Sequence, residues 1–173
     1  MVRYRFPVEA YHKAYQAGIL PERVELLDGE VYTMSPMGKN HIRYLIHLTR
    51  VLSEAFSQEA LVVSQIPLLL SRFSEPEPDL VLLRLPESRY DQRPPTAEDA
   101  LLVVEISDST LMQDRSLKLP LYQEAGIPEV WIVNLGEEVL ETYALPHYAQ
   151  ERYPKGTPAS PKAFPHRPIV WWV

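Results

Sequence analysis

The chain has 173 residues, of which 46% are hydrophobic and 23% charged, and its formal net charge is −6. This composition is that of a globular protein and excludes a disordered chain. Because cysteine is absent, disulfides, thiolate metal sites and a thiol nucleophile are excluded. The negative charge argues against a general affinity for nucleic acid, since neutralising phosphates requires clustered Lys and Arg side chains.

The sequence predicts a cytoplasmic protein without a membrane-spanning segment. No apolar run approaches the ~18–20 residues needed to cross a bilayer, and residues 1–7 lack the apolar stretch of a signal peptide. We expect a single domain over residues 1–173, with its core in about 5–145 and a proline-rich C-terminal extension in 146–173. The 17 prolines and the absence of cysteine resemble the composition of thermophilic proteins.

The first third of the chain predicts two helices separated by a hairpin. Pro7 can open a helix that Gly18 ends. The pair Asp28-Gly29 lies between two apolar runs and is a strong hairpin signal, because glycine tolerates the positive φ of a tight turn. Residues 40–59 predict the second helix. Its apolar face would carry Ile42, Leu45, Ile46, Leu48, Leu52 and Phe56.

The rest of the chain predicts strands around one further helix, at residues 110–125. Gly126 would end this helix, and Pro120 would kink it or make a new helix start near Lys118. Strands are expected at 61–70, 79–83, 100–106, 130–133 and 139–145, followed by loops and one last strand at 169–171. The predicted fold class is α/β, with a mixed β-sheet flanked by helices.

Two carboxylates and a lysine are the main candidates for chemistry. Asp79 begins an apolar strand directly after Pro78, which is also common in ordinary loops. Glu105 lies near the end of the most apolar strand, where a carboxylate is expected to be either a metal ligand or part of a buried ion pair. Two carboxylates on neighbouring strands can hold one Mg²⁺ and leave room for water and a phosphate. Lys118, on the following helix, could then orient or help deprotonate a water, or stabilise charge on the phosphate.

Several segments, taken in order, resemble the bacterial Uma-type restriction endonucleases of the PD-(D/E)XK nuclease superfamily. The resemblance covers about residues 5–145. It rests on Val24 to Val31, Met34-Ser35-Pro36, His41, Pro78-Asp79-Leu80-Val81, Val103-Val104-Glu105-Ile106-Ser107, Ser109-Thr110 with Asp114 and Lys118, and Tyr122 with Ala125 to Val133.

The resemblance implies a restriction-endonuclease-like fold, a divalent metal ion and hydrolysis of nucleic-acid phosphodiesters. It carries over Asp79 and Glu105 as metal ligands. The lysine expected two residues after the glutamate is replaced by Ser107, and Lys118 fits the displaced-lysine pattern of this family. Our hypothesis is an endonuclease, with DNA as the expected substrate, in which Asp79, Glu105 and the backbone carbonyl of Ile106 hold Mg²⁺ or Mn²⁺. By analogy with small nucleases, a homodimer is expected.

Four further polar residues are weaker candidates for the site, and each also has an ordinary structural explanation. Glu25 and Glu30 could complete the metal site or be exposed strand carboxylates, and Gln65 could support the site by hydrogen bonding or be an ordinary strand residue. Asp114 is one helical turn from Lys118, so a plain ion pair is favoured for it. Two other functions also remain open. One is a nuclease fold that binds nucleic acid or a partner protein without useful catalysis. The other is a structural protein, in which Glu105 and Lys118 pair with no open cleft above them.

Overall fold

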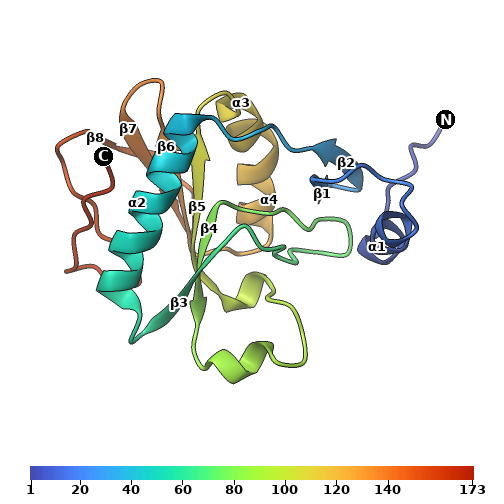
Figure 1. The fold of residues 1–173 in the computed structure, drawn as a ribbon, viewed down its shortest axis with the longest axis horizontal. Coiled ribbons are helices and arrows are strands. Elements are labelled where there is room, and N and C mark those ends of the chain that lie inside the picture. The colour runs from blue at the N-terminus through green and yellow to red at the C-terminus, as the bar shows by residue number, and fades with distance from the viewer.

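A computed structural model describes residues 1–173, which form a six-stranded sheet, a separate two-stranded sheet and helices on both sides (Figure 1). The order in the large sheet follows the sequence from β3 to β8, and only the β5–β6 pair is parallel. The predicted mixed α/β fold is therefore confirmed. The strands of the large sheet are β3 (Ala60–Ser64), β4 (Leu80–Arg84), β5 (Ala100–Ser107), β6 (Glu129–Asn134), β7 (Val139–Ala144) and β8 (Glu151–Pro154).

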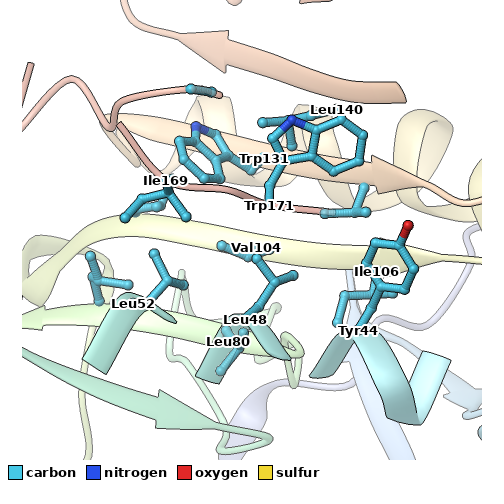
Figure 2. Packing of buried hydrophobic residues seen from close by; sticks show 14 of the residues in the cluster. Tyr44, Leu48, Leu52, Leu80, Val104, Ile106, Trp131, Leu140, Ile169 and Trp171 are labelled. Carbon is cyan, nitrogen blue, oxygen red and sulfur yellow. The ribbon is translucent and has the colours of Figure 1, made fainter. Parts of the chain in front are cut away.

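Helix α2 (Lys39–Phe56) covers one face of the sheet because every fourth residue is large and apolar. Figure 2 shows Tyr44, Leu48 and Leu52 packed on this face, and Phe56 is buried there as well. Ile42 and Ile46, which were expected on the apolar face, are instead 41% and 66% exposed. The expectation was wrong because the i, i+4 series that starts at Tyr44 is the one that faces the sheet.

The opposite face packs against the chain between β5 and β6. This crossover comprises α3 (Leu111–Gln113), a π-helical turn (Asp114–Lys118) and α4 (Leu119–Glu124). Figure 1 shows α2 and α4 on opposite sides of the sheet. Pro120 lies in the first turn of α4, where no backbone donor is needed. The helical conformation continues without a gap from Leu111 to Glu124, and α4 begins directly after the π turn that ends at Lys118.

The N-terminal part forms a smaller unit of α1 (Val8–Gln16) and the hairpin of β1 (Val24–Leu27) and β2 (Glu30–Thr33). Asp28 and Gly29 have φ angles of 51° and 78°, as the predicted tight turn requires. The hairpin is fixed to the loop that precedes β4: Leu26 and Glu75 exchange backbone hydrogen bonds, and Gly29 N–H donates to the Phe73 carbonyl (2.7 Å). This attachment brings β1 beside the start of β4.

Two segments differ from the sequence prediction. The strand expected at 61–70 ends at Ser64, and Gln65, with a φ angle of 51°, turns the chain away. The C-terminal segment was expected to be loops with a strand at 169–171, but it contains β8 and only an isolated bridge between Ala159 and Ile169. Trp171 is completely buried in the cluster between α2 and the sheet (Figure 2). None of the helices combines the length and the apolar character that a membrane span needs.

Candidate functional site

A polar cleft opens where β5 ends and β4 begins, between the hairpin, the N-terminus of α2 and the π turn. Asp79, Glu105, Ile106, Asp114 and Lys118 all line it. Each of them was a candidate from the sequence alone, although they lie up to 39 positions apart in the chain. The fold brings them together because β4 and β5 are neighbours. Only three of its 20 lining residues are hydrophobic, so the cleft suits a charged or strongly polar ligand.

Asp79 is held in position through both carboxylate oxygens. Its Oδ2 accepts the backbone N–H of Ile106 (2.7 Å), and its Oδ1 lies 2.8 Å from His41 Nε2. Burial lowers the pKa of His41, but the hydrogen bond and charge of Asp79, with Asp114 and Asp108 nearby, outweigh it and leave the pKa raised. The side chain of Asp79 is only 13% exposed, so its direction into the cleft is fixed.

Glu105 points from β5 into the same cleft and meets the crossover helix. Its Oε1 accepts hydrogen bonds from Tyr122 OH (2.6 Å) and Lys118 Nζ (3.2 Å). No buried side-chain oxygen in the protein lacks a hydrogen-bond partner, and none of the hydrogen bonds involves Glu105 Oε2. Oε2 therefore keeps contact with solvent, which is the condition for binding a cation or a water in the cleft.

Lys118 is shared between two carboxylates. Besides Glu105, its Nζ lies 3.0 Å from Oε2 of Glu25, which comes from β1 and is 3% exposed. Burial lowers the pKa of Lys118, but Glu105, Glu25 and Asp114 raise it above its ordinary value. Burial raises the pKa of Glu105, and Asp114 and Asp79 add to this effect, against the opposing charge of Lys118. One ammonium thus balances several carboxylates, and the cleft keeps an excess of negative charge.

Asp114 has different partners from the lysine that its helical spacing suggested. Its Oδ2 accepts the hydroxyls of Ser107 (2.5 Å) and Thr110 (2.8 Å), and no ion pair with Lys118 is formed. The favoured i, i+4 interpretation was therefore wrong, because the π turn changes the spacing of side chains on this helix. Burial is the largest cause of the raised pKa of Asp114.

Of the other candidate residues, Gln65 and Glu25 line the cleft and Glu30 does not. Gln65 lines the cleft, and its amide donates to the sulfur of Met37 (3.1 Å). Glu30 lies outside the cleft, where it contacts Arg3 (3.1 Å) and the hydroxyl of Tyr32 (2.5 Å). Glu25 is buried against Lys118 and the backbone N–H of Glu77, which rules out the alternative of an exposed strand carboxylate.

The donor set fits a magnesium-type ion bound by two carboxylates. No three His, Asp or Glu side chains are grouped so that they could hold a metal ion. Mg²⁺, however, usually keeps several waters and takes only one or two carboxylates from the protein. Asp79 and Glu105 meet that requirement, since both face the cleft and each carboxylate oxygen can accept more than one partner.

Two residues were given no role from the sequence: Tyr122, which is completely buried and donates a hydrogen bond to Glu105, and Arg23, which lines the cleft. Tyr122 follows Lys118 by four positions, so helical spacing could have placed both on one face toward Glu105. Arg23 precedes β1 and lines the cleft at its rim, and no motif marked it. Its position depends on how the hairpin docks, which a sequence pattern does not show.

Comparison with known proteins identifies the fold and the family of the chain. Among curated proteins none matches the chain. A crystal structure described as a "putative nuclease" from Anabaena variabilis superposes with a TM-score of 0.70 at 13% sequence identity, covering 92% of this chain and 90% of the other. That similarity shows the fold, which is the restriction-endonuclease-like arrangement expected from the sequence. The family model described as "Uma2: Putative restriction endonuclease" matches residues 8–168, and the chain therefore belongs to that family.

Proposed function

We propose that this protein is a metal-dependent endonuclease that hydrolyses phosphodiester bonds in nucleic acid, with DNA as the substrate. The observation that carries the proposal is the convergence of Asp79 and Glu105, from two neighbouring strands, on one polar cleft that also contains Lys118. Asp79 and Glu105 would hold Mg²⁺ or Mn²⁺. The ion would polarise the phosphate and lower the pKa of a bound water.

The backbone around Ile106 supports its carbonyl as a third ligand. The N–H of Leu135 donates to the Ser107 carbonyl, so the backbone polar groups of Ser107 face β6. Those of Ile106 must then face β4, as its N–H bond to Asp79 requires. Strands β4 and β5 are antiparallel, and Leu80 pairs with Val104. Continuing this pairing by two residues places Pro78 opposite Ile106, and proline has no backbone N–H that could donate to the Ile106 carbonyl. The Ile106 carbonyl is thus left without a backbone donor at this position.

The surroundings of Lys118 favour a protonated amine that donates hydrogen bonds over a neutral amine that acts as a general base. Two carboxylates within 3.2 Å raise the pKa of this amine, so it stays protonated. A protonated amine beside Glu105 can donate a hydrogen bond to the attacking water or to a phosphate oxygen and stabilise the charge that develops there. The burial of its side chain, which is 6% exposed, keeps the direction of the amine constant.

Cleavage of DNA by the purified protein tests the proposal. With Mg²⁺ or Mn²⁺, the wild type should nick or cut plasmid and short duplexes, and chelation should abolish this. Asp79→Asn and Glu105→Gln should each reduce the rate by at least about a hundredfold, because each removes a charged metal ligand. Asp91→Asn, an exposed carboxylate remote from the cleft, is the matched control and should cut normally. Cleavage unchanged by both cleft substitutions would contradict the assignment.

The second candidate is a nuclease fold that binds nucleic acid or a partner protein without useful catalysis. The pairing of Lys118 with two carboxylates and the net charge of −6 favour it. The purely structural alternative predicted a Glu105–Lys118 pair with no cleft above it. The pair is formed, but the cleft is open. Calorimetric titration with Mn²⁺ separates the two remaining functions: normal folding without metal binding would favour the non-catalytic one.

We also propose that the protein acts as a homodimer, because cutting both strands of a duplex takes two sites. Light scattering at working concentration measures this directly. A monomer with full double-strand cutting would contradict it.

A further inference from the structure

The charges that line the cleft are unevenly distributed. Its carboxylates are Glu25, Glu77, Asp79, Glu105, Asp108 and Asp114, whereas its permanent cations are only Arg23 and Lys118. Lys118 is buried and already paired with Glu25 and Glu105. Arg23 is therefore the one permanent positive charge in the cleft that no ion pair occupies.

The guanidinium of Arg23 is exposed at the rim and nearly free of protein partners. Its one hydrogen bond is a long one, from Nη2 to the Ser35 carbonyl (3.5 Å). No carboxylate lies within ion-pair distance of it, although its charge lowers the pKa of Glu77 against the larger effect of burial. Because its guanidinium forms no ion pair, Arg23 can bind an incoming phosphate through two hydrogen bonds without first losing a carboxylate partner.

The backbone of Arg23 adds an independent observation. Its φ angle is 56°, in the left-handed region that glycine prefers, and its carbonyl accepts the N–H of Met34 (2.8 Å) at the open end of the hairpin. A non-glycine residue there costs roughly 1 kcal/mol or more, and such strain collects at functional positions. Glycine would satisfy the turn at lower cost, so the backbone conformation here does not require an arginine.

We propose that Arg23 is a substrate-binding residue that contacts a phosphate of the nucleic-acid strand next to the bond that is cut. This inference rests on the proposed function, because it takes Asp79 and Glu105 as the reacting centre. Arg23 supplies affinity and alignment at the rim of an otherwise acidic cleft. The N-terminal hairpin and the residue before it would then have two roles. Glu25 of β1 holds Lys118 in place, and Arg23, directly before β1, contacts the substrate.

The test measures binding separately from cleavage. A fluorescent DNA duplex and its single strand are titrated with protein in Ca²⁺, an oxygen-ligated ion of the same charge as Mg²⁺, at several salt concentrations. Arg23→Gln should weaken binding about tenfold and reduce the slope of log K against log salt by about 0.7–0.9, the contribution of one phosphate contact. Arg23→Lys should keep the slope, since it keeps the charge. The matched control is Arg152→Gln, an exposed arginine on the edge strand β8, which should match the wild type.

Stability and turnover separate this role from a structural one. Arg23→Gly should unfold at the same temperature as the wild type or a higher one, because it relieves the left-handed φ, and yet bind as weakly as Arg23→Gln. In Mg²⁺, Arg23→Gln should raise KM with kcat little changed. If Arg23→Gln and Arg152→Gln both bind like the wild type while the wild type cuts DNA, the inference is overturned and the proposed function stands. If the wild type neither binds nor cuts, both are overturned.

Discussion

Lys118 connects the N-terminal hairpin to the central sheet. Its amine contacts Glu25 of β1 and Glu105 of β5, and all three side chains are at most 6% exposed. A buried charge without its partner is costly, so the three groups constrain one another. The lysine is therefore held in place by a strand that lies 93 positions away in the chain.

Glu25→Gln tests the role of this contact in positioning the amine. The amide keeps the shape and one oxygen but removes the charge, so Lys118 should point less consistently at the cleft. We expect kcat to fall about tenfold, with KM and Mn²⁺ affinity nearly unchanged. Reductive methylation followed by mass spectrometry should also show Lys118 more reactive than in the wild type. Glu30→Gln, on β2 and outside the cleft, is the control, and equal behaviour of the two variants would contradict the role.

The sequence predicted that Asp79 and Glu105 lie on neighbouring strands, but it did not predict the contact between Glu25 of the hairpin and Lys118. Asp79 and Glu105 could be paired because the apolar runs that carry them read as strands of one sheet. The partners of Asp114 were not predictable, because the π turn that redirects its side chain leaves no clear signal in the sequence. Glu25 was named, but its partner depends on how the hairpin packs.

The buried carboxylate of Asp99 holds together the segment between β4 and β5. Asp99 is 1% exposed and accepts hydrogen bonds from Arg93 (2.6 and 3.0 Å) and from the backbone N–H of Thr96 (2.8 Å). The Arg93 guanidinium, with Thr96, holds the pKa of Asp99 well below its ordinary value of 3.8. The charged carboxylate thus stabilises the turn that leads into β5.

Asp99→Asn should lower the free energy of unfolding by about 2 kcal/mol at neutral pH. Because the folded state lowers this pKa, the contribution is complete above 3.8 and is lost as the pH falls toward the folded value. The difference between wild type and variant should therefore shrink below pH 3.8, as urea unfolding across pH can show. Asp91→Asn, exposed in the same segment, should show no such trend. A constant difference at all pH values would contradict the assignment.

The elements themselves were largely predictable from periodicity and turn residues. The helix at α1, the Asp28-Gly29 hairpin, and strands β4 to β7 agree with the expected segments within a few residues. The errors occurred where local patterns conflict with packing. Ile42 and Ile46 extend an apolar pattern that the sheet does not cover, and Gln65 ends a strand whose apolar run continues to Leu70.

The C-terminal segment contributes side chains to the hydrophobic core that α2 and the sheet form. Trp171 is completely buried between α2 and the sheet, and its indole N–H donates to the Thr157 carbonyl (2.9 Å). Long-range packing of this kind has no local signature, so the sequence suggested a proline-rich extension of loops with one short strand at 169–171 and did not place Trp171 in the core. The segment closes the face of the sheet opposite the crossover helix.

Trp171→Ala should therefore destabilise the protein by about 3–5 kcal/mol, the usual cost of removing a large buried aromatic side chain. Trp172→Ala removes a side chain that is only partly buried and should cost clearly less. Guanidinium unfolding of both variants measures the difference. A Trp171→Ala variant as stable as the wild type would contradict the placement of this side chain in the core.

The proposed function depends on Asp79 and Glu105 sharing one metal ion. The most direct measurement is anomalous diffraction from crystals soaked in Mn²⁺. We expect one strong peak within about 2.0–2.3 Å of a carboxylate oxygen of Asp79, a carboxylate oxygen of Glu105 and the Ile106 carbonyl, with Lys118 still close to Glu105. A peak bound only by other carboxylates, or no peak in this cleft at saturating Mn²⁺, would contradict it.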